Sequence, residues 1–422
     1  SVEILQSYGM ILIILAAVVG FVMAWGIGAN DVANAMGTSV GSKALTIKQA
    51  IIIAMIFEFA GAYLAGGEVT STIRKGIIDT AYFIDIPEYL VLGMISALFA
   101  AGIWLGVASY LGWPVSTTHS IIGAIIGFTA VGVSMDAVAW SKVGGIVGSW
   151  VVTPAISGII AYLIYQSASK LIFQTDKPFE NAQKYVPFYM AFAGFVMALV
   201  TIKKGLKHVG LDMSDTSGYL LAIALSVVIA FIGKWLISRQ TYSHSDDAEL
   251  QRANVEKVFA LLMVVTACCM AFAHGSNDVA NAIGPLAAVV SVVSTGEITA
   301  SSTLAPWILP LGGLGIVAGL ALFGHRVIAT IGEGITHLTP SRGFAAEMAA
   351  ACTVVIASGT GLPISTTQTL VGAVLGVGLA RGVSALNLGI IRNIVISWIV
   401  TLPAGAILSI ACFFTLKAIF GV

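Results

Sequence analysis

Charged side chains are scarce in this 422-residue chain. Asp, Glu, Lys and Arg make up 9% of it, against roughly 25% in soluble domains. Hydrophobic residues make up 58%, and the mean hydropathy is +0.98. So few charges cannot cover a water-facing surface, which excludes a soluble enzyme. A formal net charge of +0 also argues against binding of nucleic acid, which needs a basic face. The chain is therefore predicted to lie in a lipid bilayer.

Cysteine is scarce as well. The four cysteines all lie in apolar runs and show no CxxC spacing, which indicates small buried side chains rather than a disulfide framework or a metal site. The chain also shows no pattern of a nucleophile beside a base. We therefore expect neither an enzyme nor a resident cofactor.

Long apolar runs make up most of the sequence. At roughly 20 residues per transmembrane helix, they predict an all-α polytopic membrane protein with about ten to twelve membrane segments. The runs at 117–133, 344–358 and 366–380 are short and Gly-rich, which favours broken or re-entrant helices. The twelve runs cover approximately 7–27, 44–66, 88–111, 117–133, 140–166, 185–202, 218–238, 256–274, 305–330, 344–358, 366–380 and 388–419.

Three sequence blocks occur twice, in the same order and at nearly one offset. GANDVANAMG (28–37) matches GSNDVANAIG (275–284), GWPVSTT (112–118) matches GLPISTT (361–367), and SWVVT (149–153) matches SWIVT (397–401). The chain is therefore read as a duplication, with a first repeat at 1–165, intervening helices and polar loops at 166–255, and a second repeat at 256–422. Seven apolar runs separate the starts of the two copies. If all seven cross the membrane, the second copy is inverted, as in secondary transporters.

The two NDVAN blocks place a carboxylate and two amides directly after an apolar run. Helix capping would explain one such block. Two intramembrane carboxylates without a nearby Lys or Arg instead favour a bound cation, Na⁺ or H⁺. The predicted sodium ligands are Asn30, Asp31, Asn34, Asn277, Asp278 and Asn281.

The two STT blocks follow prolines that interrupt apolar stretches, Pro114 and Pro363. Each block is expected to begin a half-helix inside the membrane, where unpaired N–H groups and the helix dipole attract an oxyanion. Ordinary capping and packing by small polar side chains is the alternative. The predicted anion-binding residues are Ser116, Thr117, Thr118, Ser365, Thr366 and Thr367.

Two further acids lie within apolar runs. Glu58 favours cation binding or proton exchange. Glu347 is a second candidate coupling acid, with an ion pair to Arg342 as the structural alternative. The roles of His119 and His274 stay open between a hydrogen-bonded helix residue and a ligand.

Four segments carry a resemblance to a known family: GANDVANAMGTSVGSKALT, FEFAGAYLAGGEVTSTIRKGIID, AHGSNDVANAIGP and SGTGLPISTTQ. Together they resemble the inorganic phosphate transporter (PiT) family, from the first apolar run to Trp398. The resemblance implies sodium- or proton-driven phosphate uptake by an inverted-repeat carrier. It also implies functional roles for Asp31, Glu58, Asp278 and Glu347, and phosphate contacts from both STT blocks. The region between the repeats is short beside the long loop of animal members.

These observations predict a sodium-coupled inorganic phosphate symporter that works by alternating access. Its partners would be phosphate, Na⁺ as the coupling ion, and the lipid of a cell (plasma) membrane that the chain crosses several times. A homodimer is among the oligomeric states compatible with the sequence. A proton-coupled phosphate carrier, a sulfate carrier and an anion channel are the alternatives.

Overall fold

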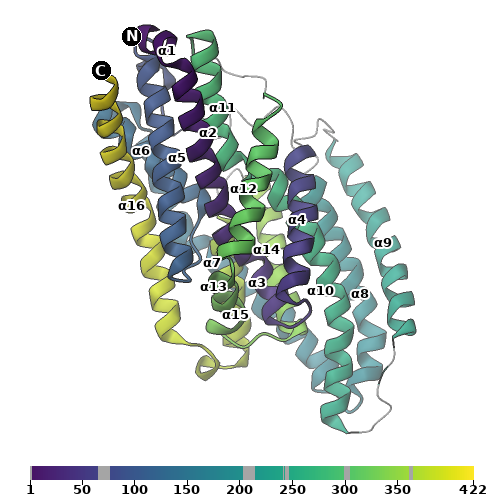
Figure 1. Ribbon diagram of the computed structural model, residues 1–422. Helices are drawn as coiled ribbons and strands as arrows, with labels where there is room; N and C mark the ends of the chain where they lie inside the picture. Colours follow the sequence, from purple (N-terminus) through teal and green to yellow (C-terminus); the bar gives the residue numbers. More distant parts are fainter. Residues whose placement is uncertain are drawn as a thin grey trace.

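The computed structural model describes residues 2–64, 77–202, 214–240, 242, 247–298, 305–360 and 365–422. Most of these residues are helical (Figure 1). In this described part the β-structure amounts to one isolated bridge between Ile78 and Val138. All twelve apolar runs are helical over most of their described residues, so the predicted all-α class is confirmed.

The helices follow one another with short connections. They are α1 (Val2–Ser7), α2 (Gly9–Ile27), α3 (Ala33–Gly41), α4 (Ile47–Leu64), α5 (Pro87–Tyr110), α6 (Thr117–Gly132), α7 (Trp140–Ala168), α8 (Pro178–Val200), α9 (Asp215–Arg239), α10 (Ala248–Asp278), α11 (Ala280–Thr295), α12 (Ile308–Phe323), α13 (His325–Ala329), α14 (Pro340–Thr360), α15 (Thr366–Arg381) and α16 (Leu388–Phe420). Both α7 and α10 extend across the repeat limits expected at residues 165 and 255, so that division stays a prediction.

Six helical segments of the described residues are long and apolar enough to cross a membrane. A seventh forms if α12 and the helical segment His325–Gly334, which meet at 63°, count as one bent span. The two helices that begin at the STT blocks, α6 and α15, have 16 residues each. At 1.5 Å per residue they are about 24 Å long, shorter than the roughly 30 Å hydrocarbon core. This agrees with the predicted broken helices.

Equivalent helices of the two copies run in opposite directions. In Figure 1, α2 descends from the end of the bundle that holds the N-terminus, whereas α10 ascends toward that end. The same opposition holds for α6 and α15, and for α7 and α16. The arrangement is therefore the inverted repeat that the sequence predicts.

The two copies are interlocked through glycine contacts. Helix α6 packs on α16 of the other copy, and α15 packs on α7. At four glycines of these seams a Cβ would lie 2.1–2.7 Å from a backbone atom of the partner helix, so that only glycine permits the approach. The contacts are Gly123 on Leu402, Gly127 on Ala406, Gly372 on Pro154 and Gly376 on Gly158. Each contact of one copy recurs in the other at the sequence offset of the duplication.

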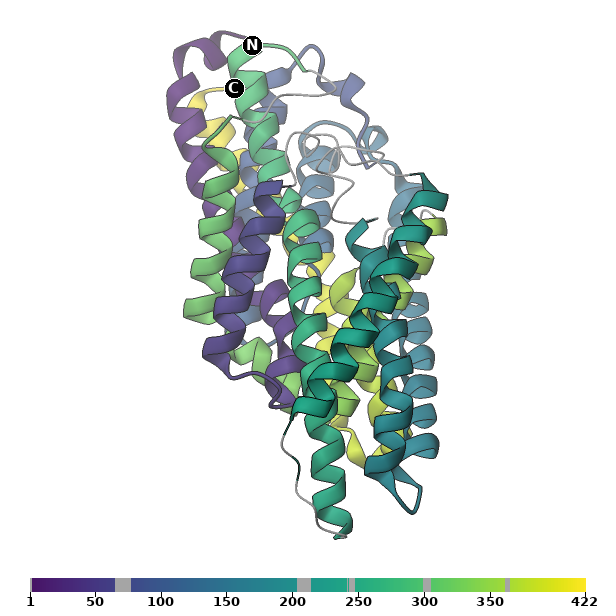
Figure 2. The same ribbon diagram turned by 90° about the vertical axis from the view of Figure 1, so that its right-hand side faces the viewer.

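Helices α8 and α9 form a hairpin at the edge of the bundle (Figures 1 and 2). They pack on each other, and α8 also contacts α10 and α14. Much of α9 is exposed, including the large side chains of Phe231 and Trp235. In a membrane protein such a surface faces lipid or another subunit.

Candidate ion and phosphate site

Both NDVAN blocks lie where a long helix is interrupted. The first forms a π-helical turn, Gly28–Val32, between α2 and α3, and the second spans the junction of α10 and α11. Gly28 and Gly275 open these blocks, and a Cβ there would lie 1.9 Å from the carbonyl oxygen of Ile316 and 2.1 Å from that of Glu58, respectively. These contacts press each block against a neighbouring helix. π-Helical turns of this kind are frequent at functional sites.

The aspartates of the two blocks are buried together around His274. The Nδ1 atom of His274 lies 2.6 Å from Asp278 Oδ2 and 3.8 Å from Asp31 Oδ2. The ligand atoms of the three residues lie within 4.8 Å of one another. The structure thus brings together the two predicted acids and places an imidazole between them.

Glu58 lies beside this cluster. Its side chain is 1% exposed, and neither carboxylate oxygen has a hydrogen-bond donor among the described residues. It interacts electrostatically with His274, Asp278 and Asp31. A buried carboxylate without a donor needs a proton or a cation, so Glu58 belongs with the candidate ion-binding groups.

The STT blocks begin α6 and α15 as expected. The Ser116 Oγ accepts the N–H of His119 at 3.1 Å, and the Ser365 Oγ accepts the N–H of Gln368 at 3.2 Å. These two serines therefore act as helix caps here, which was the alternative interpretation for them. Pro363 and the rest of 361–364 lie outside the described residues.

Threonines of both STT blocks meet at Asp31. The Thr367 hydroxyl donates to Asp31 Oδ1 at 2.8 Å, and the Thr117 hydroxyl donates to Oδ2 at 3.5 Å. The first turns of two half-helices, one from each copy, therefore flank a single carboxylate. Thr118 and Thr366 are half-buried next to them.

The asparagines of the NDVAN blocks have different environments. Asn281 donates from Nδ2 to the hydroxyls of Thr117 and Thr118, at 3.2 Å each, which links the second NDVAN block to the first STT block. Asn34 is buried, and its Oδ1 has no hydrogen-bond partner among the described residues. The side chain of Asn277 lies outside what the structure describes.

Asn30 connects the first NDVAN block to the loop before α6. Its Nδ2 donates to the carbonyl oxygen of Trp113 at 2.8 Å and to the Ser109 hydroxyl at 3.2 Å. Its Oδ1 accepts the Val115 N–H at 3.0 Å. Because these contacts fix the chain that leads into Ser116, Asn30 orients the STT block, and one lone pair of its amide oxygen is already used.

Glu347 lies in a second polar cluster. Its oxygens accept hydrogen bonds from the Thr38 hydroxyl at 3.0 Å and the Thr266 hydroxyl at 2.5 Å. Arg342 instead donates to the carbonyl oxygen of His337 at 3.1 Å. In the described part of the chain Glu347 thus has hydroxyl partners and no ion pair with Arg342.

The sequence left His119 and His274 open, and the structure separates them. His119 accepts from the Trp150 indole N–H at 3.2 Å and is a hydrogen-bonded helix residue. His274 lies in the acid cluster, which the sequence analysis did not include among the site residues. The available signal was its position four residues before Asp278, one helical turn away.

Comparison with known proteins supports the same site. A family model described as the phosphate transporter family matches residues 27–409. A Haemophilus influenzae protein named "Putative phosphate permease" is 59% identical over 419 residues, covering 99% of this chain and 100% of that protein. The Arabidopsis thaliana protein named "Inorganic phosphate transporter 2-1, chloroplastic" is 44% identical over 410 residues, covering 93% of this chain and 70% of that protein.

A solved structure has the same fold. It is titled "The sodium-dependent phosphate transporter", is 42% identical, and covers 97% of this chain and 99% of its own with a TM-score of 0.83. The resemblance seen in the motifs is thus confirmed over nearly the whole length. This multi-pass membrane protein belongs to the phosphate transporter family.

Proposed function

We propose that this protein is a sodium-coupled phosphate symporter that works by alternating access. The observation that carries the proposal is the meeting of two aspartates, one from each inverted copy, with the first turns of two half-helices. Thr117 and Thr367 connect the half-helices to Asp31. Secondary transporters place substrate and coupling ions at such a repeat interface.

The cation would bind at the oxygens of Asp31 and Asp278. Asn34 Oδ1 and the Glu58 carboxylate add buried oxygens that have no hydrogen-bond partner in the described chain. Oxygen ligands of this kind suit a hard cation such as Na⁺. We regard Asn30, Asn277 and Asn281 as further candidate ligands, with Asn30 limited to the free lone pair of its amide.

Phosphate would bind at the N-termini of α6 and α15. The unpaired N–H groups of the two first turns and the positive ends of both dipoles stabilise an oxyanion there without arginine. Hydroxyls of Thr117, Thr118, Thr366 and Thr367 would supply further hydrogen bonds. The capping serines, Ser116 and Ser365, would position these groups.

The hydrogen bond from Thr367 to Asp31 suggests how the two ligands are coupled. In this structure the hydroxyl proton of Thr367 is directed at the Asp31 carboxylate. A cation that binds the carboxylate would satisfy its charge and free the hydroxyl to donate to phosphate. The same cation would remove the repulsion between Asp31 and the anion.

His274 favours a second candidate, coupling to protons. An imidazole titrates near neutral pH, and this one lies 2.6 Å from a site carboxylate. Glu347, held by Thr38 and Thr266, is a further candidate coupling acid in either case. We place the transporter in the cell membrane, although the Arabidopsis relative is named as chloroplastic.

Uptake of radiolabelled phosphate into proteoliposomes tests these assignments. An inward Na⁺ gradient at equal pH should drive accumulation, and a pH gradient in Na⁺-free choline buffer should not. Accumulation with the pH gradient alone would overturn the sodium assignment in favour of protons. Dissipative phosphate flux that neither gradient drives uphill would indicate a channel.

A further inference from the structure

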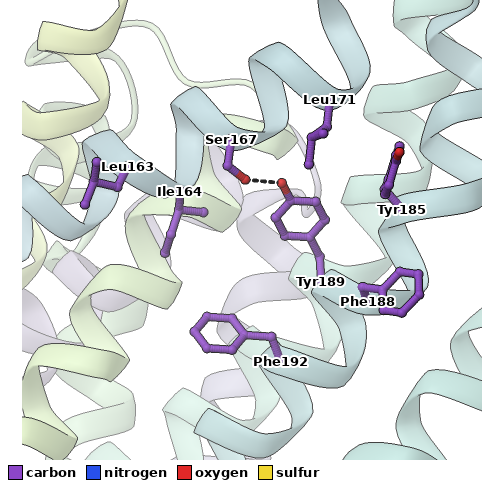
Figure 3. Close-up of a pocket in the computed structure, with 8 residues that line it drawn as sticks. All are labelled: Leu163, Ile164, Ser167, Leu171, Tyr185, Phe188, Tyr189 and Phe192. Carbon is purple, nitrogen blue, oxygen red and sulfur yellow. Dashed lines mark hydrogen bonds between the residues drawn. The ribbon is translucent and has the colours of Figure 1, made fainter.

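An apolar groove lies at the edge of the bundle, between the C-terminal half of α7 and helix α8 (Figure 3). It encloses a volume of about 380 Å³. Leu163 lines the α7 side, and Phe188 and Phe192 line the α8 side. These three side chains are exposed, between 44% and 72%. The groove is therefore accessible from the surrounding membrane and is separate from the ion cluster.

The polar atoms inside the groove satisfy each other. The Ser167 hydroxyl and the Tyr189 phenol form a hydrogen bond across it (Figure 3). Because each group has its partner, the wall offers an occupant mainly apolar and aromatic surface. Such a surface suits a hydrocarbon chain better than a polar molecule.

Two lysines mark one end of the groove. Lys170 follows Ser167 by three residues on the same helical segment, and Lys184 precedes Phe188 by four, so each lies about one turn beyond the apolar wall on the groove side. Both are exposed, and neither forms an ion pair in the described part of the chain. Lys184 Nζ lies 5.2 Å from the centre of the Tyr185 ring, at the same end. An occupant with an apolar body and an anionic head fits this distribution of charge.

We propose that the groove binds an anionic phospholipid. One acyl chain would lie along Leu163, Phe188 and Phe192, and the headgroup phosphate would contact Lys170 and Lys184. The charge at one end favours a lipid over a second copy of this chain, because an apolar helix face of a partner subunit would leave both lysines unmatched.

The groove adjoins the helices that carry the Glu347 cluster. The Tyr189 ring makes an edge contact with the Phe344 ring of α14, with centroids 6.2 Å apart, and lies 6.3 Å from the Phe259 ring of α10. Phe344 precedes Glu347 by one turn, and α10 also carries Thr266. A lipid in the groove would therefore bear on the same two helices.

Lipid binding to the purified full-length protein tests the proposal. Native mass spectrometry would count phosphatidylglycerol and phosphatidylcholine molecules retained after mild delipidation. At about 1 kcal/mol per lysine near an anionic headgroup, the double variant K170Q/K184Q should lose about thirtyfold of the preference for phosphatidylglycerol. The matched control K48Q/K142Q removes the same charge from two exposed lysines outside the groove and should keep that preference.

A second variant tests the acyl-chain part. Leu163→Trp adds volume inside the groove and leaves both lysines in place, so it should lower retention of both lipids. Equal retention of the two lipids by the wild-type protein, or an unchanged preference in K170Q/K184Q, would overturn the proposal. So would a Leu163→Trp protein that retains lipid normally but dissociates from dimer to monomer, because the groove would then be a subunit contact.

Discussion

Removal of Na⁺ is expected to weaken phosphate binding by about two orders of magnitude. The Thr367 hydroxyl lies 2.8 Å from Asp31 Oδ1, and a phosphate oxygen in contact with that hydroxyl would add about 2.8 Å more. The anion would then lie within about 6 Å of the carboxylate. Two unit charges at that separation repel by about 3 kcal/mol at an effective dielectric constant of 20. This corresponds to roughly a hundredfold change in the dissociation constant.

Calorimetry on the purified protein measures this effect directly. The phosphate dissociation constant would be determined across a Na⁺ series at fixed ionic strength, with choline as the replacement ion. Linkage requires that saturating phosphate tighten Na⁺ binding by the same factor. The Asp31→Asn variant provides the control: it removes the repelling charge, so its phosphate affinity without Na⁺ should rise and its Na⁺ dependence should shrink. A wild-type dissociation constant that stays flat across the series would refute the coupled-site reasoning.

Three further outcomes are expected. Asp278→Asn should abolish Na⁺-driven uptake in proteoliposomes while size-exclusion profiles show an intact protein; normal uptake would remove this carboxylate from the ion site. Thr117→Val and Thr366→Val should each weaken phosphate binding in calorimetry by about 1–3 kcal/mol, the value of a hydrogen bond to a charged group, and unchanged affinity in both would limit the STT blocks to capping. Gly275→Ala should lower the melting temperature in detergent, because its Cβ would lie 2.1 Å from a backbone oxygen and overpacking costs about 1–3 kcal/mol or more. Gly144→Ala, with nothing within 4 Å of the added Cβ, should melt at or above the wild-type temperature.

Much of the fold follows from patterns that repeat along the chain. The apolar runs predict the helices, and the doubled NDVAN and STT blocks predict which ends meet, because paired motifs in an inverted repeat lie at its interface. The contacts of Asp31 with Thr117 and Thr367 agree with that reasoning. What the repeats share could be predicted from the sequence.

What the two copies do not share was harder to predict. His274 has Ile27 as its counterpart in the first copy, so comparison of the repeats gave it no weight, although it lies between the two aspartates. Asn30 has the composition of a cation ligand, yet its amide is used by Trp113 and Val115. These contacts depend on the path of the loop before α6, which sequence spacing does not determine. The lipid-facing groove beside α7 likewise depends on how α8 packs and has no motif.

The glycine seams between the copies bear on how the protein is synthesised. Helices α6 and α7 leave the ribosome about 250 residues before α15 and α16, which complete their contact surfaces. At 5–20 residues per second this interval lasts roughly 12–50 s. During that time the glycine-lined faces of the first copy have no partner helix, and lipid or an insertion factor must cover them. The duplication therefore makes assembly a late event, in which the second half of the chain enters the membrane and closes around helices that have waited there.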